Sequence, residues 1–364
     1  MARLARFRRE RGEDLALLTA VARYVFEQHI TQKDVPAKIE ETFGKKISVS
    51  TVSRLLDRAV ALGLVTTYVK PPRQLQLQEA LLHTLAPKHV HTVCVVPRGV
   101  GNNEENLGLM GAEQLLTAIR AIGPSKTRVA ITLSGGMTLW KVLKSFFTLM
   151  SPDIRCELQQ KQFELYPAFL ADDSGLEYLF PHTLIGEFGT NLKDALGPNH
   201  RGDRVTATLL TLPPDFYGCD ETVRKRFLTA FPKIEAAIAK AKQADIFLLR
   251  IGALKHDGHE DRAYDAFLQR LDPMLDLQDE EYGVETFFIP LRADDGKEHA
   301  TIRDKIIAVK ISELRQLAQQ PGKQVIVVAG GKSKCRAIKH ALENPYFNVL
   351  VTDEDVAEFL VEQT

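Results

Sequence analysis

The first sixty residues place apolar side chains with the 3.6-residue period of an α-helix. Apolar residues recur every three or four positions from 14 to 28, which predicts a first helix. A second helix is predicted over 31–43 (TQKDVPAKIEETF), with Thr31 as its N-cap and Gly44 as its end.

A third helix is predicted to begin at Ser50 or Ser48 and to stop at Gly63, because STVSRLLDRAVALG gathers its apolar residues on one face. The stretch LVTTYVK (64–70) then alternates between apolar and polar positions, as a β-strand does. Three short helices followed by a strand are typical of a winged helix-turn-helix.

From residue 90 onward, short apolar runs alternate with stretches of helical periodicity. Strands are predicted over 90–96, 128–133, 163–165, 206–212, 245–251, 324–328 and 349–351. Helices are predicted over 104–122, 138–147, 224–243, 311–318, 332–342 and 353–361. Apolar strands between helices indicate a mostly parallel sheet with helices on both faces, so we expect a large doubly wound α/β domain.

The expected organisation is therefore a small winged helix-turn-helix domain over 1–73, a linker helix over 74–89, and an effector-binding and oligomerisation domain over 90–364. The linker sequence QLQLQEALLHTL has a helical apolar stripe. That stripe fits two roles equally well: pairing with a second copy of the chain, or packing on its own domain.

Charge distinguishes the two ends of this 364-residue chain, whose net charge is zero. Residues 1–73 carry 14 lysine and arginine residues against 8 acidic residues, and the remainder carries 33 against 39. A basic segment on an acidic body is expected when one end meets a polyanion such as nucleic acid. A solvated basic tail is the alternative reading of the same charge.

Several classes of protein are disfavoured. No apolar run reaches the roughly 18–20 residues that a membrane-spanning helix needs, so no membrane is expected as a partner. The arginine-rich start lacks the apolar core of a secretory signal. The four cysteines lie far apart without metal-ligand spacing, which favours a reduced, cytoplasmic protein without a disulfide framework.

The start of the third helix carries the side chains that would read DNA. In a winged helix-turn-helix this helix enters the major groove, where hydroxyls contact phosphates and arginines contact guanine. The candidate DNA-binding residues are Ser50, Thr51, Ser53, Arg54 and Arg58. The alternative is a plain three-helix bundle in which the serines and threonine only cap helices.

Two strand-to-helix turns of the large domain are candidate anion sites. In RVAITL-SGGM-TLWKVL, Gly135 and Gly136 lack a Cβ, so backbone N–H groups can approach an anion, and Ser134 and Thr138 add hydroxyl donors. The spacing is that of neither a dinucleotide fingerprint nor a triphosphate loop, and a sugar phosphate is a natural occupant. The alternative is a pair of glycines that only serve a tight turn.

The second turn, QVIVVA-GGKSK-CRAIKHAL, repeats the arrangement with Gly330 and Gly331 and adds ammonium groups at Lys332 and Lys334. Cations in the first turn of a helix are unfavourable by themselves, which favours a ligand role for Lys334 over a merely solvated turn.

A third turn, FLLRIGALKHDGHEDRA, could carry acid–base chemistry. Asp257 and His259 flank Gly258 after a strand end, and such a pair can move protons near neutral pH. A polar surface loop is the plainer reading. His256 and His259 are three residues apart, but no third metal ligand is evident, so neither a metal nor a cofactor is expected.

The segments ITQKDV and ISVSTVSRLLDRAVALGLV resemble the helix-turn-helix of the SorC/DeoR-type sugar-responsive bacterial transcriptional regulators. The closing segment VIVVAGGKSKCRAIKHALENPYFNVLVTDEDVAEFL is similar to the C-terminal signature of the same regulators. In the family's glycine-rich GIG motif, this chain has Arg250 in place of the first glycine. The SGGM turn also departs from the family's usual loop.

This resemblance implies an effector domain like the phosphosugar isomerases, assembled as a dimer or tetramer. It implies effector-binding roles for Gly135, Gly136, Met137, Thr138 and Lys334. The leading hypothesis is a regulator of carbohydrate metabolism, a repressor or an activator, that binds double-stranded operator DNA under control of a phosphorylated sugar. The rival hypotheses are a sugar-phosphate isomerase, deaminase or lactonase using Asp257 and His259, and a sensor that acts on protein partners.

Overall fold

The computed structural model describes the chain outside residues 1–14, 29, 63, 66–72, 86–88, 100, 124–125, 172–179, 198–203, 254–261, 275–281, 287–288, 293–296 and 364. The chain divides into two compact units, Met1–Val69 and Lys70–Thr364. Each unit is described by itself below.

The first unit is helical. Residues 15–26 form a helix, followed by α2 (Val35–Phe43) and α3 (Val49–Ala61). The buried apolar residues of all three helices form one small core: Leu17, Val21, Val35, Ile39, Val52 and Leu56. This core is what the predicted apolar periodicity requires.

The start of α2 differs from the prediction. The helix begins at Val35 with Asp34 as its N-cap residue, and not at Thr31. The Thr31 hydroxyl instead donates to the Asp34 carboxylate at 2.6 Å. Pro36 explains the late start, because a proline lacks an N–H and fits best in the first turn of a helix. Gly44 ends α2 at φ 63°, as predicted.

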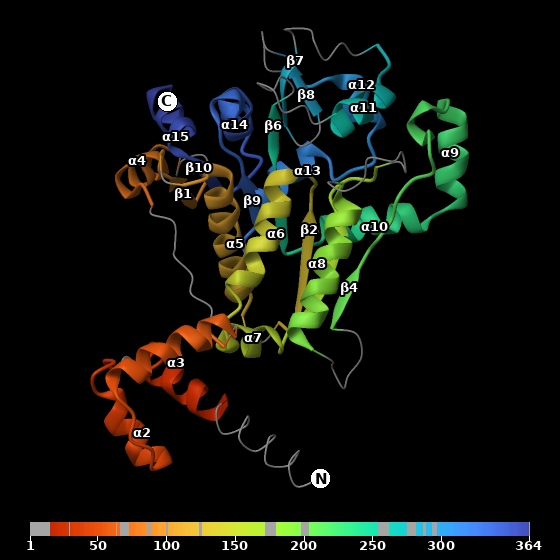
Figure 1. Cartoon of the computed structure of the whole chain (residues 1–364). Helices are drawn as coiled ribbons and strands as arrows, with labels where there is room; N and C mark the ends of the chain where they lie inside the picture. The colour runs from red at the N-terminus through yellow and green to blue at the C-terminus, as the bar shows by residue number, and fades with distance from the viewer. Residues whose placement is uncertain are drawn as a thin grey trace. The chain divides into compact units, whose positions relative to one another are not determined.

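The larger unit is built on a seven-stranded, all-parallel sheet in the order β1-β10-β9-β5-β2-β3-β4. Its strands are β1 (Thr92–Val96), β2 (Arg128–Leu133), β3 (Gln162–Pro167), β4 (Val205–Ala207), β5 (Ile246–Leu249), β9 (Gln324–Val328) and β10 (Val349–Asp353). A small antiparallel sheet of β6 (Ile251–Ala253), β7 (Tyr282–Thr286) and β8 (Ile289–Arg292) lies beyond the carboxyl ends of the main strands (Figure 1).

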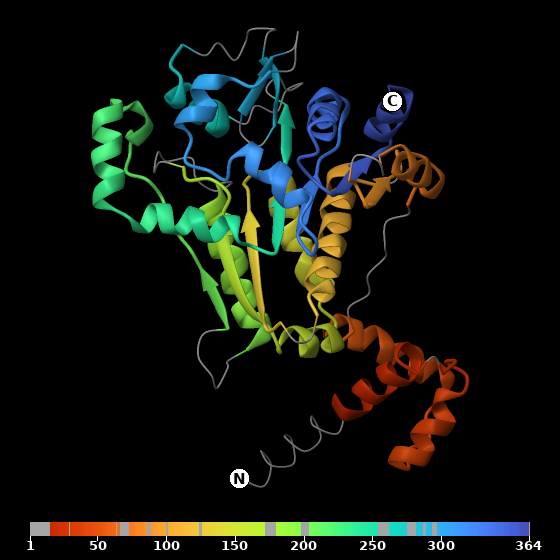
Figure 2. The same cartoon turned by 180° about the vertical axis from the view of Figure 1, so that it is seen from behind.

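Helices cover both faces of the main sheet. One face carries α5 (Asn103–Ala121), α6 (Met137–Thr148), α7 (Pro152–Leu158) and α8 (Pro181–Leu196). Helices α5, α6 and α8 stand in front of the sheet in Figure 1. The other face, turned toward the viewer in Figure 2, carries α4 (Leu75–Leu85), α10 (Lys233–Lys242), α13 (Ile311–Ala318), α14 (Cys335–Glu343) and α15 (Glu354–Glu362). The doubly wound α/β prediction is therefore confirmed.

The remaining helical segments are the 3₁₀ turns η2 (Phe216–Gly218) and η3 (Lys332–Lys334) and the helices α9 (Glu221–Ala230), α11 (Arg262–Leu271) and α12 (Ala300–Lys305). The helix predicted over 224–243 is thus two helices, separated at Pro232, which has no N–H to donate. None of the helices within the described ranges is long and apolar enough to cross a membrane.

Successive strand residues supply the two cores alternately, as a sheet buried on both sides requires. In β2, Val129, Ile131 and Leu133 face the α5–α6 side. Ala130 faces the α4–α14 side. Helix α4 belongs to this body: Leu81 is fully buried, and Leu85 is 1% exposed. Of the two roles expected for this helix, packing on its own domain is therefore the one that the described side chains of α4 show.

Two glycines let α5 approach α6 closely. A Cβ on Gly108 would lie 2.8 Å from the Cβ of Lys141, and one on Gly111 would lie 2.7 Å from Val142 Cγ2. Both distances are too short for a real contact, so only glycine fits at this helix crossing. The glycines therefore hold α5 and α6 as one closely packed layer.

Candidate functional site

The first candidate surface is the start of α3. Ser48 is its N-cap, because the backbone N–H of Thr51 donates to Ser48 Oγ at 3.1 Å. The hydroxyls of Ser50 and Thr51 lie 2.8 and 2.9 Å from the same oxygen. Of the two predicted starts, Ser48 is therefore the capping residue, and Ser50 and Thr51 share its hydrogen-bond network.

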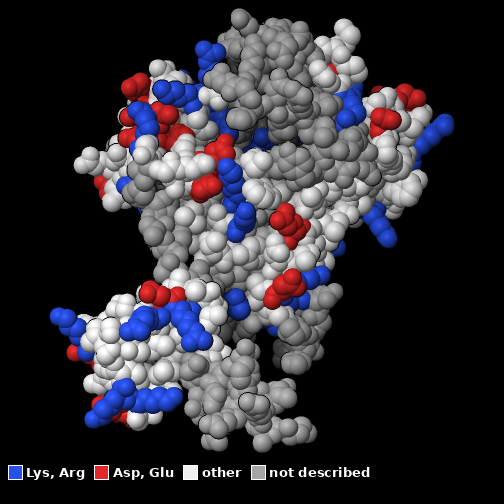
Figure 3. All heavy atoms as spheres, viewed as in Figure 1, with Lys and Arg blue, Asp and Glu red and all other residues white. Residues whose placement is uncertain are grey.

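The predicted DNA-reading side chains lie on one face of α3. Ser50, Ser53, Arg54 and Arg58 are exposed and Thr51 is partly exposed. The opposite face packs Val52, Leu56 and Ala59 into the core of the unit. Figure 3 shows lysine and arginine side chains on the surface of this unit. Most of the predicted wing, 66–70, falls outside the described residues.

The second candidate site lies where β2, β5 and β9 end. These three strands are neighbours, and the chain leaves β2 toward β3 on one side but returns to β5 on the other. The reversal makes the β2–β5 boundary the switch point of the sheet. In open α/β sheets, ligands bind in the crevice at such a point.

The turn after β2 is tight and mostly buried. Ser134, Gly135 and Gly136 are buried, whereas Thr138 is partly exposed and Met137 is 40% exposed. Gly136 is the N-cap residue of α6 and has φ 106°, a conformation that favours glycine. The helix start has no side-chain cap. Its first backbone N–H groups therefore remain as donors without an intrahelical partner.

The turn after β9 has the same construction. Gly331 precedes η3 with φ 99°, and its backbone N–H donates to Asp353 Oδ2 at 2.6 Å. A Cβ on Gly330 would lie 2.6 Å from the same oxygen and 2.7 Å from Leu107 Cδ1. Lys332 is exposed, and Lys334 is partly buried.

Burial and the nearby carboxylates of Asp353 and Asp355 raise the pKa of Cys335, which follows this turn, to about 11. The side chain is therefore a neutral thiol at physiological pH, and it packs as part of the core.

Arg250 connects the turns across the switch point. Its backbone N–H donates to Ser134 Oγ at 3.2 Å, and the Ser134 N–H donates to Leu248 O at 3.0 Å. Its side chain covers Gly136, where an added Cβ would lie 2.4 Å from Arg250 Cδ. The next strand, β6, packs against η3. Arg250 therefore stands between the two glycine turns.

In the sequence, Arg250 stands out only as a departure from the GIG motif, and Asp353 was not predicted as a site residue. An acidic residue directly after an apolar strand and before a helix is the signal that points to such a buried cap. The predicted acid–base turn with His256, Asp257, Gly258 and His259 lies outside the described residues. Among the residues that are described, no three His, Cys, Asp or Glu side chains gather as a metal site would need.

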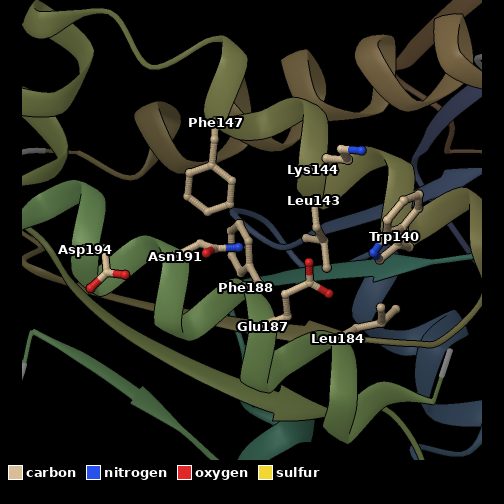
Figure 4. Close-up of a pocket in the computed structure, with 9 residues that line it drawn as sticks. All are labelled: Trp140, Leu143, Lys144, Phe147, Leu184, Glu187, Phe188, Asn191 and Asp194. Atoms are coloured by element: carbon tan, nitrogen blue, oxygen red, sulfur yellow. The ribbon is translucent and has the colours of Figure 1, made fainter. Parts of the chain in front are cut away.

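A groove of about 350 Å³ lies between α6 and α8 (Figure 4). Its wall contains the rings of Trp140, Phe147 and Phe188. The ammonium group of Lys144 lies 4.9 Å from the centroid of the Trp140 ring, within cation–π range. None of the predicted effector-binding residues lines this groove, which runs along the helix face instead of the strand ends.

Comparison with known proteins gives this architecture a family context. Residues 202–362 match a family model described as "Putative sugar-binding domain". The full-length sorbitol operon regulator SorC from Klebsiella pneumoniae has a similar structure, with a TM-score of 0.66 and 21% identity over 96% of this chain and 99% of that one. The chain resembles the SorC/DeoR-type regulators. The predicted resemblance is thereby confirmed.

Two other solved structures have a similar fold. A DeoR family transcriptional regulator from Listeria monocytogenes and a transcriptional regulator from Streptococcus pneumoniae each align with a TM-score of 0.53 and 16% identity over 79% of this chain. The alignments cover 98% and 97% of those chains. At these identities the likeness is one of fold. No curated protein matches the chain.

Proposed function

We propose that this chain is a DNA-binding transcriptional regulator of carbohydrate metabolism whose operator affinity changes when a phosphorylated sugar binds at the strand ends. The main support is the pair of turns after β2 and β9. Each has a glycine of positive φ before a helical turn, and both lie at one edge of the sheet. The second turn and β5 belong to the segment matched by the sugar-binding family model.

The chemistry of the turns suits a sugar phosphate. Free N–H groups at a helix start attract an anion, and the ammonium of Lys334 can neutralise a second negative charge. Thr138 is partly exposed in the first turn of α6 and can donate to a phosphate or sugar oxygen. Ser134 lies fully buried and holds Arg250 by its backbone, so its role in this proposal is to position the site.

A series of hydrogen bonds connects the second turn with the start of the larger unit. Asp353 holds Gly331, and the adjacent Glu354 accepts a hydrogen bond from Gln74 Nε2 at 3.2 Å. Gln74 is also anchored by its N–H to Val95 O at 3.1 Å, and Arg73 pairs with the buried Glu113 at 2.8 Å. A ligand that shifts the turn would thus bias the anchoring of residues 73 and 74, which lead toward the DNA-reading unit.

Binding to DNA is assigned to the exposed face of α3, and the protein is expected to act as a dimer or tetramer on a symmetric operator. No turnover is assigned to the chain, because a sensor reports a concentration only when it leaves its ligand unchanged.

The test is a gel-shift with the DNA upstream of the chain's own gene, with and without a panel of sugar phosphates. A sugar phosphate that changes the operator affinity of the parent, and not of Lys334→Ala or Thr138→Val, supports the proposal. NMR of the same mixtures should show binding without conversion. Conversion well above background, or an operator affinity that no sugar phosphate changes, would contradict it.

A further inference from the structure

Arg250 is fixed at the switch point by hydrogen bonds on its backbone. Its N–H donates to the hydroxyl of Ser134, which is itself fully buried. The register pairs Leu133 of β2 with Leu248 of β5, so Arg250 lies just beyond the carboxyl ends of both strands. Its side chain therefore starts from a defined point at the edge of the sheet where a ligand is expected.

The side chain then crosses the start of α6. An ideal Cβ on Gly136 would meet Arg250 Cδ at 2.4 Å, Nε at 2.7 Å and Cζ at 3.1 Å. Glycine at 136 thus provides both the positive φ and the space that the arginine occupies. The outer part of the Arg250 side chain therefore lies next to the N-cap residue of a 12-residue helix.

Two sources of positive charge meet at this place. A helix start carries a partial positive charge. An oxyanion bound at this place can accept hydrogen bonds both from the backbone N–H groups and from the planar fork of the guanidinium. The η3 turn with Lys332 and Lys334 packs against β6, the strand that follows Arg250.

We propose that Arg250 determines the ligand specificity of this site by binding the oxyanion of the sugar ligand together with the first turn of α6. The inference rests on the proposed function, and it adds a ligand residue that a glycine at the same position would not supply. The shared chemistry is an oxyanion on a sugar. A phosphate monoester and the carboxylate of a sugar acid are its two sources, and the phosphate is the better match to an arginine fork and Lys334 combined.

The experiment is calorimetry on the full chain and its Arg250→Lys, Arg250→Gly and Lys339→Ala variants. The probes are hexose 6-phosphates, an aldonate, inorganic phosphate and a free hexose. Lys339 is the control because it lies on α14 and pairs with Glu343 at 3.9 Å. Circular dichroism establishes that each variant is folded.

Arg250→Gly is expected to lower the affinity for the phosphorylated hexose about tenfold or more. Arg250→Lys should lose less, because it keeps the charge but not the fork, and Lys339→Ala should match the parent. Preference of the parent for the aldonate would identify a carboxylate as the ligand group.

Equal or tighter binding of the phosphorylated hexose by Arg250→Gly would overturn the role of Arg250 while leaving the proposed function intact. A parent that binds no oxyanion-bearing sugar would overturn both.

Discussion

The backbone N–H of Gly331 and the carboxylate of Asp353 are joined by a hydrogen bond of 2.6 Å. The same carboxylate accepts from Asn103 Nδ2 at 2.8 Å and caps α15 through the N–H of Val356 at 3.1 Å. Asp353 is 3% exposed. One buried side chain thus fixes the second glycine turn, the start of α5 and the start of α15 at once.

Asp353→Asn is expected to lower the free energy of unfolding by about 1–3 kcal/mol, because the amide offers one acceptor oxygen where the carboxylate offers two. Denaturant unfolding of parent and variant measures the change. Asp153→Asn is the control, since that carboxyl is exposed at the start of α7 and its loss should change stability by less than about 0.5 kcal/mol. Equal stability of the Asp353 variant and the parent would contradict the assigned role.

Gly111→Ala is expected to destabilise the larger unit by about 1–3 kcal/mol, because the new methyl group would overpack the contact with Val142 and Val328. Gly186→Ala is the matched control on α8, where the nearest atom to an added Cβ is Leu209 Cδ2 at 3.5 Å. That control should be neutral or stabilise by up to about 1 kcal/mol, since alanine is the better helix former. The midpoint temperatures of thermal unfolding of the two variants should therefore shift in opposite directions or by clearly different amounts.

Arg54→Ala is expected to weaken specific operator binding by about 1–3 kcal/mol and to relax the sequence preference. Arg23→Ala removes another exposed arginine of the same unit, one that pairs with Glu27 at 3.0 Å. The control should lower affinity for all DNA sequences alike, if at all. Fluorescence anisotropy with operator and scrambled DNA separates the two effects, and an unchanged preference in Arg54→Ala would remove α3 from the reading surface.

A fall in pH is expected to destabilise the larger unit through His340. Burial lowers the pKa of this histidine, and the carboxylates of Glu298 and Glu343 only partly oppose the effect. The unfolded chain therefore binds the proton at a higher pH than the folded one, so the stabilisation is present above the ordinary pKa of 6.5 and is lost as the pH falls below it. His340→Gln should lose less thermal stability than the parent between about pH 7.5 and about pH 5.5. A steeper loss in the variant would contradict this sign.

The repeating strand and helix pattern predicted the fold because buried parallel strands such as β9 are short, continuous apolar runs. The pattern did not predict α8 or the small sheet from β6 to β8. Hydrophobic periodicity reports which side of an element is buried, and it says little about which elements come together.

The two glycine turns were predicted as candidate sites from the residues alone, because paired glycines between a strand and a helix let backbone N–H groups approach an anion. The contact of Arg250 with Gly136 could not be predicted in the same way. Those residues are 114 positions apart in sequence, and their contact depends on β2 and β5 being neighbours in the sheet. Strand order is a property of the folded chain, not of local spacing.

Trp140 gives the chain an internal optical probe. It is the only tryptophan in the sequence, and its backbone N–H donates to the carbonyl of Gly136 at 3.0 Å. The indole ring lies partly exposed beneath the ammonium group of Lys144. The intrinsic fluorescence of the unlabelled protein therefore arises in the first turn of α6, so its emission maximum and its quenching by acrylamide can follow a titration at the neighbouring glycine turn in real time.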